Sequence, residues 1–231
     1  MEEEKILEKR KERRKEFLDW DIEKDLPLHV GPYDLERTDE QEGRIYQAFR
    51  WIDRSSGWQI KAVFDEETAD YMIKIDLKFI TFTLIEVISD DFESFKVNVK
   101  NLVPAAIEKE LIQRYKISVL IKDKGFMNWE YEKLLPLQAG KYRRVIEPKE
   151  PVSGLNGSYI IAAYECSERE TAMIFFYNVY REEYYGEMQV RGIPIMIHQY
   201  DGKTIEEFSK AIEGNLEKDL DYLYGYTAAS E

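Results

Sequence analysis

Hydrophobic residues occupy every second position in several stretches of the chain, which is the pattern of strands with one buried face. The clearest alternation covers residues 58–64, and a second covers residues 73–79. A single strand from residue 72 to residue 88 would be about 55 Å long at about 3.3 Å per residue, which is too long. A bulge, a bend or a second strand is therefore expected near residue 80. Further strands are expected at residues 44–52, 117–121, 159–164, 172–181 and 187–200.

Three stretches carry helix signals, at residues 3–18, 91–114 and 204–224. The last signal is the strongest because apolar residues recur at helical spacing along its whole length. These residues are Ile205, Phe208, Ile212, Leu216, Leu220 and Leu223. Thr204 and Glu207 have the spacing of a capping box at the start of this helix.

The first predicted helix is almost entirely charged in its middle, over residues 9–15. Its apolar residues stand near the two ends, with Phe17 and Trp20 closing the segment. One interpretation is a solvated helix pinned at its ends. The other is a basic arm that docks on an acidic surface, such as that of a second copy of the chain.

These elements predict an α+β fold, mostly antiparallel sheet with amphipathic helices packed on one face. Residues 44–111 and 158–220 share a layout of strands followed by an amphipathic helix, which favours two similar halves. The alternative is two halves that share only generic patterning. The predicted organisation, which one compact domain could also accommodate, is an N-terminal charged helix (1–20), a first half (21–135, irregular over 21–43), a linker or long loop (136–157) and a second half (158–231).

Composition narrows the expected binding partners and cellular location of the protein. The 231 residues carry a formal net charge of −13, which disfavours binding to nucleic acid. The N-terminus has no basic start followed by an apolar run, and no stretch approaches the ~20 apolar residues that span a bilayer. We therefore expect a cytoplasmic protein that does not bind membranes.

Few residues can support metal or nucleophilic chemistry. The chain has one cysteine, Cys166, and two histidines, His29 and His198, none of them in a metal-binding spacing. We predict no metal site and no cofactor. A Cys–His dyad is formally possible, although a thiol on a strand and two ordinary histidines explain the same residues. No catalytic pair can be chosen from 46 acidic residues.

Residues 172–200 predict a hairpin with two unlike faces if residues 182–185 form its turn, which places Arg181 opposite Gly186. One face is apolar and carries Met173, Phe175, Tyr177, Val179, Met188, Val190 and Pro194. The other mixes aromatic and polar side chains and is too apolar for plain exposure to solvent. Either a second helix covers that face, or it is a partner or ligand surface. The candidate residues of this surface are Phe176, Asn178, Tyr180, Glu187, Gln189 and Arg191.

These observations favour a non-catalytic binding or regulatory protein that acts on another protein or on a second copy of itself, with a homodimer as one form. The alternative is a small-molecule enzyme that uses carboxylates, tyrosines and His198 for acid–base chemistry. An enzyme should gather polar groups with shifted pKa values in one cleft, whereas a binding module should show a broad apolar or aromatic surface.

Lys203 is predicted not to bind nucleotides, although Gly202, Lys203 and Thr204 match the end of a phosphate-binding loop. The full motif needs a glycine where this chain has Ile197. Calorimetric titration with ATP and Mg²⁺ should give no binding heat. A signal that Lys203→Ala abolishes would contradict this prediction.

Overall fold

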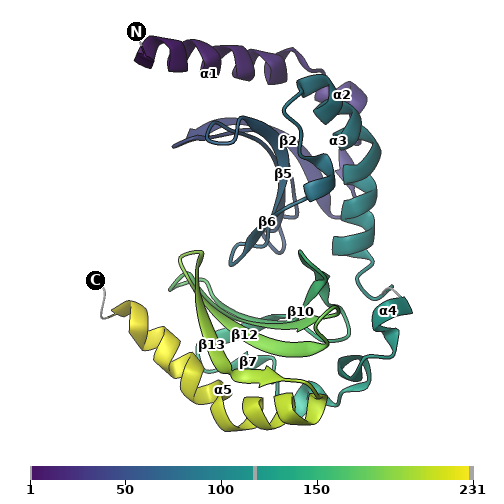
Figure 1. The fold of residues 1–231 in the computed structure, drawn as a ribbon, viewed down its shortest axis with the longest axis vertical. Helices are drawn as coiled ribbons and strands as arrows, with labels where there is room; N and C mark the ends of the chain where they lie inside the picture. The colour runs from purple at the N-terminus through teal and green to yellow at the C-terminus, as the bar shows by residue number, and fades with distance from the viewer. Residues whose placement is uncertain (1, 117–118, 229–231) are drawn as a thin grey trace. The chain divides into compact units, whose positions relative to one another are not determined.

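The computed structural model describes residues 2–116 and 119–228, and divides the chain into two units, Met1–Ile112 and Gln113–Glu231. Each unit contains one antiparallel sheet with helices (Figure 1). The predicted α+β class with two similar β-rich halves is thereby confirmed. Within the described residues, no helix is both long and apolar enough to cross a membrane.

The first unit holds a six-stranded sheet with the strand order β1-β2-β3-β4-β5-β6. Its elements are α1 (Glu2–Asp19), α2 (Ile22–Asp25), β1 (His29–Val30), β2 (Tyr33–Glu42), β3 (Ile45–Ile52), β4 (Gln59–Asp65), β5 (Asp70–Asp76), β6 (Thr81–Thr83), the 3₁₀ turn η1 (Ile85–Val87), α3 (Phe92–Ala106) and the π-helical η2 (Ile107–Ile112). The phase change near residue 80 marks the turn between β5 and β6.

Helix α1 is held on its own unit at its C-terminal end and along its charged middle. Phe17 and Trp20 are buried, with 1% and 3% of their surfaces exposed. Arg10 pairs with Glu66 at 2.7 Å, and Arg14 pairs with Asp39 at 2.5 Å. The basic segment therefore docks on acidic side chains of the same unit.

Strand β2 lies where the sequence suggested an irregular connection. Tyr33 is buried at its start, but residues 39–42 are exposed at its end. Only part of the strand contacts the core, so its sequence lacks the alternation that marks the other strands.

Helix α3 has Asp91 as its N-cap residue. The side chain of Asp91 accepts a hydrogen bond from the backbone N–H of Ser94 at 2.8 Å. Pro104 lies inside the last turn, and the chain continues as η2 in π-helical form. Proline has no N–H donor, so Pro104 interrupts the α-helical hydrogen bonding just before this change.

The second unit holds a sheet with the order β13-β12-β11-β10-β8-β7, with β9 also paired to β10. Its elements are α4 (Val119–Lys122), the 3₁₀ turns η3 (Gly125–Asn128) and η4 (Tyr131–Lys133), β7 (Gln138–Ala139), β8 (Tyr142–Ile146), β9 (Val152–Ser153), β10 (Ser158–Cys166), β11 (Thr171–Asn178), β12 (Glu183–Val190), β13 (Ile193–Gly202) and α5 (Ile205–Ala228).

Several local expectations differ from this structure. Residues 136–157, expected as a linker or long loop, carry the three short strands β7, β8 and β9. A strand was expected at residues 117–121, but residues 119–122 form a helical turn and residues 117–118 lie outside the described part of the chain. Residues 125–128 and 131–133 form the 3₁₀ turns η3 and η4.

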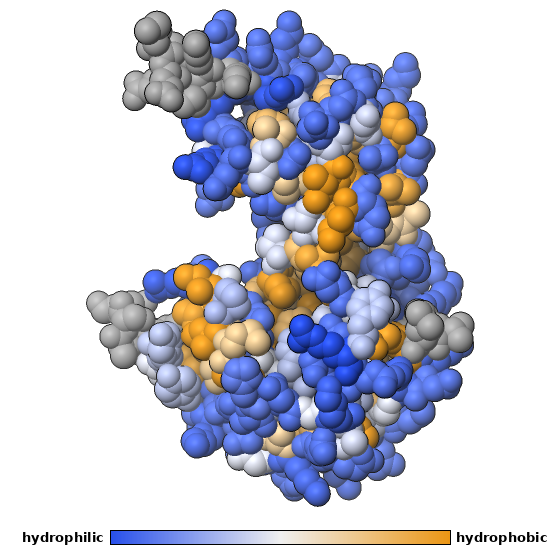
Figure 2. Space-filling model, in the orientation of Figure 1, coloured by the Kyte–Doolittle hydropathy of each residue, from blue (hydrophilic) through white to orange (hydrophobic). Residues whose placement is uncertain are grey.

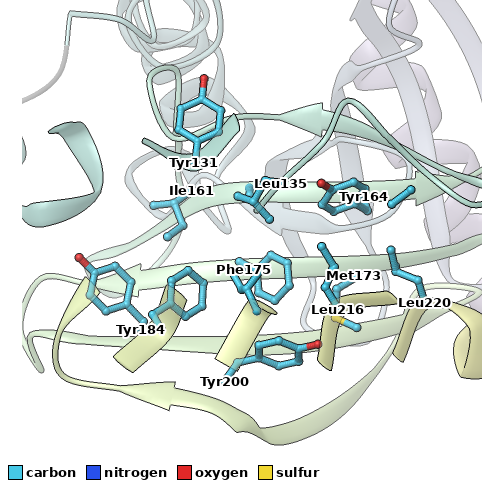
Figure 3. Close-up of a cluster of buried hydrophobic side chains, with 14 of the residues drawn as sticks. Tyr131, Leu135, Ile161, Tyr164, Met173, Phe175, Tyr184, Tyr200, Leu216 and Leu220 are labelled. Carbon is cyan, nitrogen blue, oxygen red and sulfur yellow. The ribbon is translucent and has the colours of Figure 1, made fainter. Parts of the chain in front are cut away.

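Helix α5 covers one face of the second sheet and closes the core of this unit (Figure 3). Phe208 packs edge-on against Phe175 and stacks on Tyr184, with ring centroids 5.6 Å and 5.0 Å apart. The expected capping box is present: Thr204 Oγ1 accepts from the N–H of Glu207, and Glu207 Oε2 accepts from the N–H groups of Thr204 and Lys203.

The two units repeat one layout, a meander of antiparallel strands followed by a helix. The four-residue loops 66–69 and 167–170 occupy corresponding places, and the last residue of each, Ala69 and Glu170, has a positive φ. The units diverge after this hairpin. The three-residue β6 follows β5, whereas the long strands β12 and β13 follow β11.

Leu216→Ala is predicted to destabilise the protein by about 2–5 kcal/mol, because Leu216 is buried between α5 and the sheet and its truncation leaves a cavity. Thr204→Ala should cost about 1 kcal/mol through the lost cap. Glu217→Ala is the control, since the neighbouring Glu217 is exposed. Chemical denaturation measures all three, and equal stability of Leu216→Ala and Glu217→Ala would show that α5 is a detachable arm.

Candidate functional site

The hairpin of β12 and β13 ends in a two-residue turn made by Arg191 and Gly192. Their φ angles are 50° and 76°, so both residues have a left-handed backbone conformation. This is the signature of a type I′ turn, whose twist matches that of the flanking strands. The expected strand over residues 187–200 is thereby divided between β12 and β13.

The pairing of β11 with β12 differs in register from the expected one. Phe175, rather than Arg181, lies opposite Gly186. The difference is an even number of residues, so each side chain keeps its predicted face. Met173, Phe175 and Tyr177 accordingly belong to the core under α5.

Pro194 of β13 lies on the face opposite to the expected one. Pro194 pairs with Gln189 and Ile193 pairs with Val190. Pro194 is therefore on the outer face, away from α5, and Ile193 is on the inner face. The cause is the tight turn at Arg191 and Gly192, which reverses the chain where a continuous strand was expected.

Four of the six candidate residues lie on the outer face of β11 and β12. Phe176 stacks on Tyr185 with ring centroids 4.8 Å apart. Asn178 Nδ2 donates to Ser158 Oγ at 3.0 Å, and its Oδ1 accepts from the backbone N–H groups of Tyr180 and Arg181. Phe176 and Asn178 are both buried, and Asn178 holds the turn that follows β11.

Glu187 and Gln189 form the polar centre of this face. Gln189 Nε2 donates to Glu187 Oε1, whereas the buried Gln189 Oε1 has no hydrogen-bond partner. Burial raises the pKa of the Glu187 carboxyl above its usual range. The pair therefore offers a free acceptor beside a carboxyl group that is inclined to hold a proton.

The other two candidates stand at turns. Tyr180 is 81% exposed and covers Gly157, where an added Cβ would lie 2.5 Å from its ring. Arg191 lies at the opposite end of β12, with its guanidinium 3.8 Å from Glu170. The six residues thus form a buried polar and aromatic face with an exposed side chain at each end.

The outer edge of β13, which no candidate residue predicted from the sequence marks, belongs to the most exposed apolar strand of this unit. Ile193 is 67% exposed, Met196 is 59% exposed, and Pro194 lies between them. Figure 2 shows apolar surface over this end of the hairpin. The available signal was the absence of Asp, Glu, Lys and Arg from residues 192–200.

The geometry of the turn shows which backbone groups this edge offers. In a two-residue hairpin the closing pair, Val190 and Ile193, exchanges hydrogen bonds, and the next pair does not. Pro194, Met196 and His198 therefore direct their backbone groups away from β12. Proline fits this position because it has no N–H to donate.

The other strands at sheet edges in the described residues are short or charged. β1 and β7 have two residues each, and β6 has three. Most of β2 extends past β1, and it carries six charged side chains: Asp34, Glu36, Arg37, Asp39, Glu40 and Glu42. Short and charged edges resist the addition of another strand. The ten-residue β13 has neither protection over residues 193–200.

Tyrosine–carboxylate pairs occur at several separate places rather than in one cleft. Tyr46 donates to Asp39, Tyr131 donates to Glu147, and Tyr200 donates to Asp219, at 2.7–2.9 Å. Burial, reinforced by the neighbouring carboxylate, raises the pKa of each of these hydroxyls. Each tyrosine therefore stays protonated near neutral pH.

The first unit contains a cavity of about 440 Å³ beside α1. Arg10, Arg13 and Arg44 line it, but all three are engaged. Arg10 pairs with Glu66, Arg44 with Glu67, and Arg13 with Glu16, at 2.7, 3.3 and 2.9 Å. The cavity is thus bordered by neutralised ion pairs.

The histidines and the cysteine are held apart from any shared centre. His198 Nδ1 lies 2.9 Å from Asp201 on the exposed side of β13, and His29 Nδ1 lies 2.7 Å from Asp34. Cys166 is buried in the core of the second unit. No cluster of three potential metal ligands occurs among the residues that the structure describes.

Comparison of the chain with protein-family models, with curated proteins and with solved structures finds no match.

Glu187→Gln is predicted to stabilise the protein near pH 7 and to have less effect near pH 4. A raised native pKa means that the folded state holds the proton more tightly than the unfolded state. The wild-type protein therefore loses stability as the pH rises from the unfolded pKa of about 4.3 through the native one. Urea denaturation of both proteins at the two pH values measures the difference.

Glu183→Gln on the same strand is the matched control. Lys203 lowers the pKa of Glu183, followed in effect by Arg181. Its stabilising contribution is present above the unfolded pKa and is lost as the pH falls through the native one. Glu183→Gln should therefore destabilise the protein near pH 7. Effects of the same sign for both variants at pH 7 would contradict the assignment at Glu187.

Proposed function

We propose that this chain is a non-catalytic protein-interaction module that binds its partner by accepting an additional strand along β13. The observation that carries the proposal is the contrast between sheet edges. Among the described residues, β13 is a long edge strand with exposed apolar side chains and uncharged residues from Ile193 to Tyr200. Strand addition to such an edge is a common mode of peptide and protein recognition.

The backbone supplies the affinity in this mode, and alternate side chains supply the selectivity. Met196 offers both an N–H and a C=O at the edge, while Pro194 offers a C=O alone. The side chains of Pro194 and Met196 form the apolar part of the outer face, and Glu187 and Gln189 lie beside them on β12. An incoming strand would therefore need an apolar side chain opposite Met196.

The partner is proposed to be a protein because the edge is linear, exposed and apolar. An enzymatic role would require acids and bases that converge on one cavity. The tyrosine–carboxylate pairs lie at separate places, and His198 is exposed beside Asp201, so this alternative has less support. We also propose a cytoplasmic location, which agrees with a single reduced and buried cysteine.

Site-specific photo-cross-linking in the native host is the test. The photoreactive residue p-benzoylphenylalanine replaces Met196 in one full-length chain and Leu137 in another. Leu137 is the matched control, because it is 61% exposed and precedes β7 at the other edge of the same sheet. The proposal expects a discrete cross-linked protein from position 196 and none from position 137.

A second label at Ile193 keeps the test specific to the edge. It should give the same adduct, and adding Met196→Lys to that chain should remove it, since a buried lysine at the new strand pair is costly. Equal cross-linking at positions 137 and 196, or no adduct at position 196, would contradict the proposed function.

A further inference from the structure

We propose that the strand accepted by β13 is β13 of a second copy of this chain, paired antiparallel across a two-fold axis at Met196. The inference rests on the proposed function, since it requires that this edge accepts a strand. In a two-fold arrangement the same patch serves both subunits, so each residue that faces another is faced by it in return. A self-complementary edge is therefore the requirement.

The backbone and the charges together select Met196 as the residue on the axis. An axis at Ile195 would place Pro194 in both flanking hydrogen-bonded pairs, and an axis at Ile197 would bring Arg191 toward Lys203 of the other copy. An axis at a residue whose own backbone groups point outward must lie at Pro194, Met196 or His198. An axis at Pro194 would place two residues without N–H donors against each other. An axis at His198 would require regular pairing beyond it. Beyond His198, the side chains of Gln199 and Tyr200 both donate hydrogen bonds to Asp219, at 2.9 and 2.7 Å. Two successive side chains therefore point to the same face, which breaks the alternation of the strand.

With the axis at Met196, the two strands form four backbone hydrogen bonds. The N–H of each Met196 donates to the C=O of Met196 in the other copy. The N–H of each His198 donates to the C=O of Pro194 in the other copy. The missing N–H of Pro194 removes one bond at each end and leaves the centre intact.

The side chains in this register are complementary on both faces. Met196 meets Met196 on the outer face, and Ile195 meets Ile197 of the other copy on the inner face. Ile195 and Ile197 already pack partly against the core of their own unit. Pairing would therefore cover apolar surface that a single chain leaves exposed.

Charge complementarity supports a second copy as the occupant. Extended past the regular pairs, which end at Pro194 and His198, the register brings the turn residue Arg191 near Asp201 of the other copy at both ends of the paired segment. Their side chains are 54% and 50% exposed, so each can reach across the edge. Between them, residues 192–200 carry no Asp, Glu, Lys or Arg. Two copies of a chain with a net charge of −13 would thus contact each other along a strand without formal charges, with opposite charges at each end of the contact.

Analytical ultracentrifugation of the full chain at low salt, ~50 mM, tests the inference, because weak ion pairs are least screened there. The wild-type chain should reach twice 27.5 kDa as its concentration rises. Arg191→Asp alone and Asp201→Arg alone should each weaken the dimer about tenfold, since both variants turn two attractive pairs into repulsive ones. Arg181→Asp is the control, because Arg181 is exposed at the opposite end of β12.

An equimolar mixture of Arg191→Asp and Asp201→Arg chains is the decisive sample. In the mixed dimer both pairs are opposite in charge again, so association should return to the wild-type level. Simple loss of folding cannot produce this recovery. Met196→Lys should weaken the dimer by at least about tenfold, because it places like charges directly opposite each other at the axis.

A wild-type chain that stays monomeric at all concentrations would overturn the inference, as would a dimer whose variants are not rescued by mixing. Either result leaves the proposed function standing if position 196 cross-links a different protein. If position 196 cross-links nothing, the proposed function fails as well.

Discussion

The second unit depends on the burial of the apolar stripe of α5 against one face of its sheet. A helix of this length is marginal in water by itself, so its stability comes from packing. Phe208 lies among Phe175, Tyr184 and Trp129, and Tyr200 from β13 completes the same core. This packing also decides what β13 presents: Ile195 and Ile197 pack partly against that core, whereas Ile193, the backbone edge and the outer side chains are left to solvent.

The two units show how one layout can be adapted. Each sheet is a meander that ends in a helix, and the hairpin loops 66–69 and 167–170 match in length and backbone conformation. The difference lies in what is inserted before the helix. The first unit closes its sheet with β6, whereas the second adds β12 and β13 and gains a long edge. The proposed binding strand therefore belongs to the part in which the two units differ.

Much of the fold could be predicted because strong periodicity reports burial on one face. The stripe from Phe208 to Leu220 predicted α5 and its cap, and parity along β11 predicted the correct faces even with a wrong register. β2 was missed because acidic residues dominate its exposed half. The turn at Arg191 and Gly192 was missed because the turn of the hairpin was placed at residues 182–185 instead. The identity of the edge strand could not be predicted, since the order of strands in a sheet depends on tertiary pairing.

The shortness of β7 has a consequence for stoichiometry. A sheet with two long, uncharged edges can add copies without limit and grow into a fibre. Here the far side of the same sheet ends in Gln138 and Ala139, which offer too few backbone groups to template another chain. Once β13 is occupied, growth of this sheet stops. The fold would thereby separate the proposed association from polymerisation, and a change that lengthened β7 would remove that separation without touching the proposed binding strand.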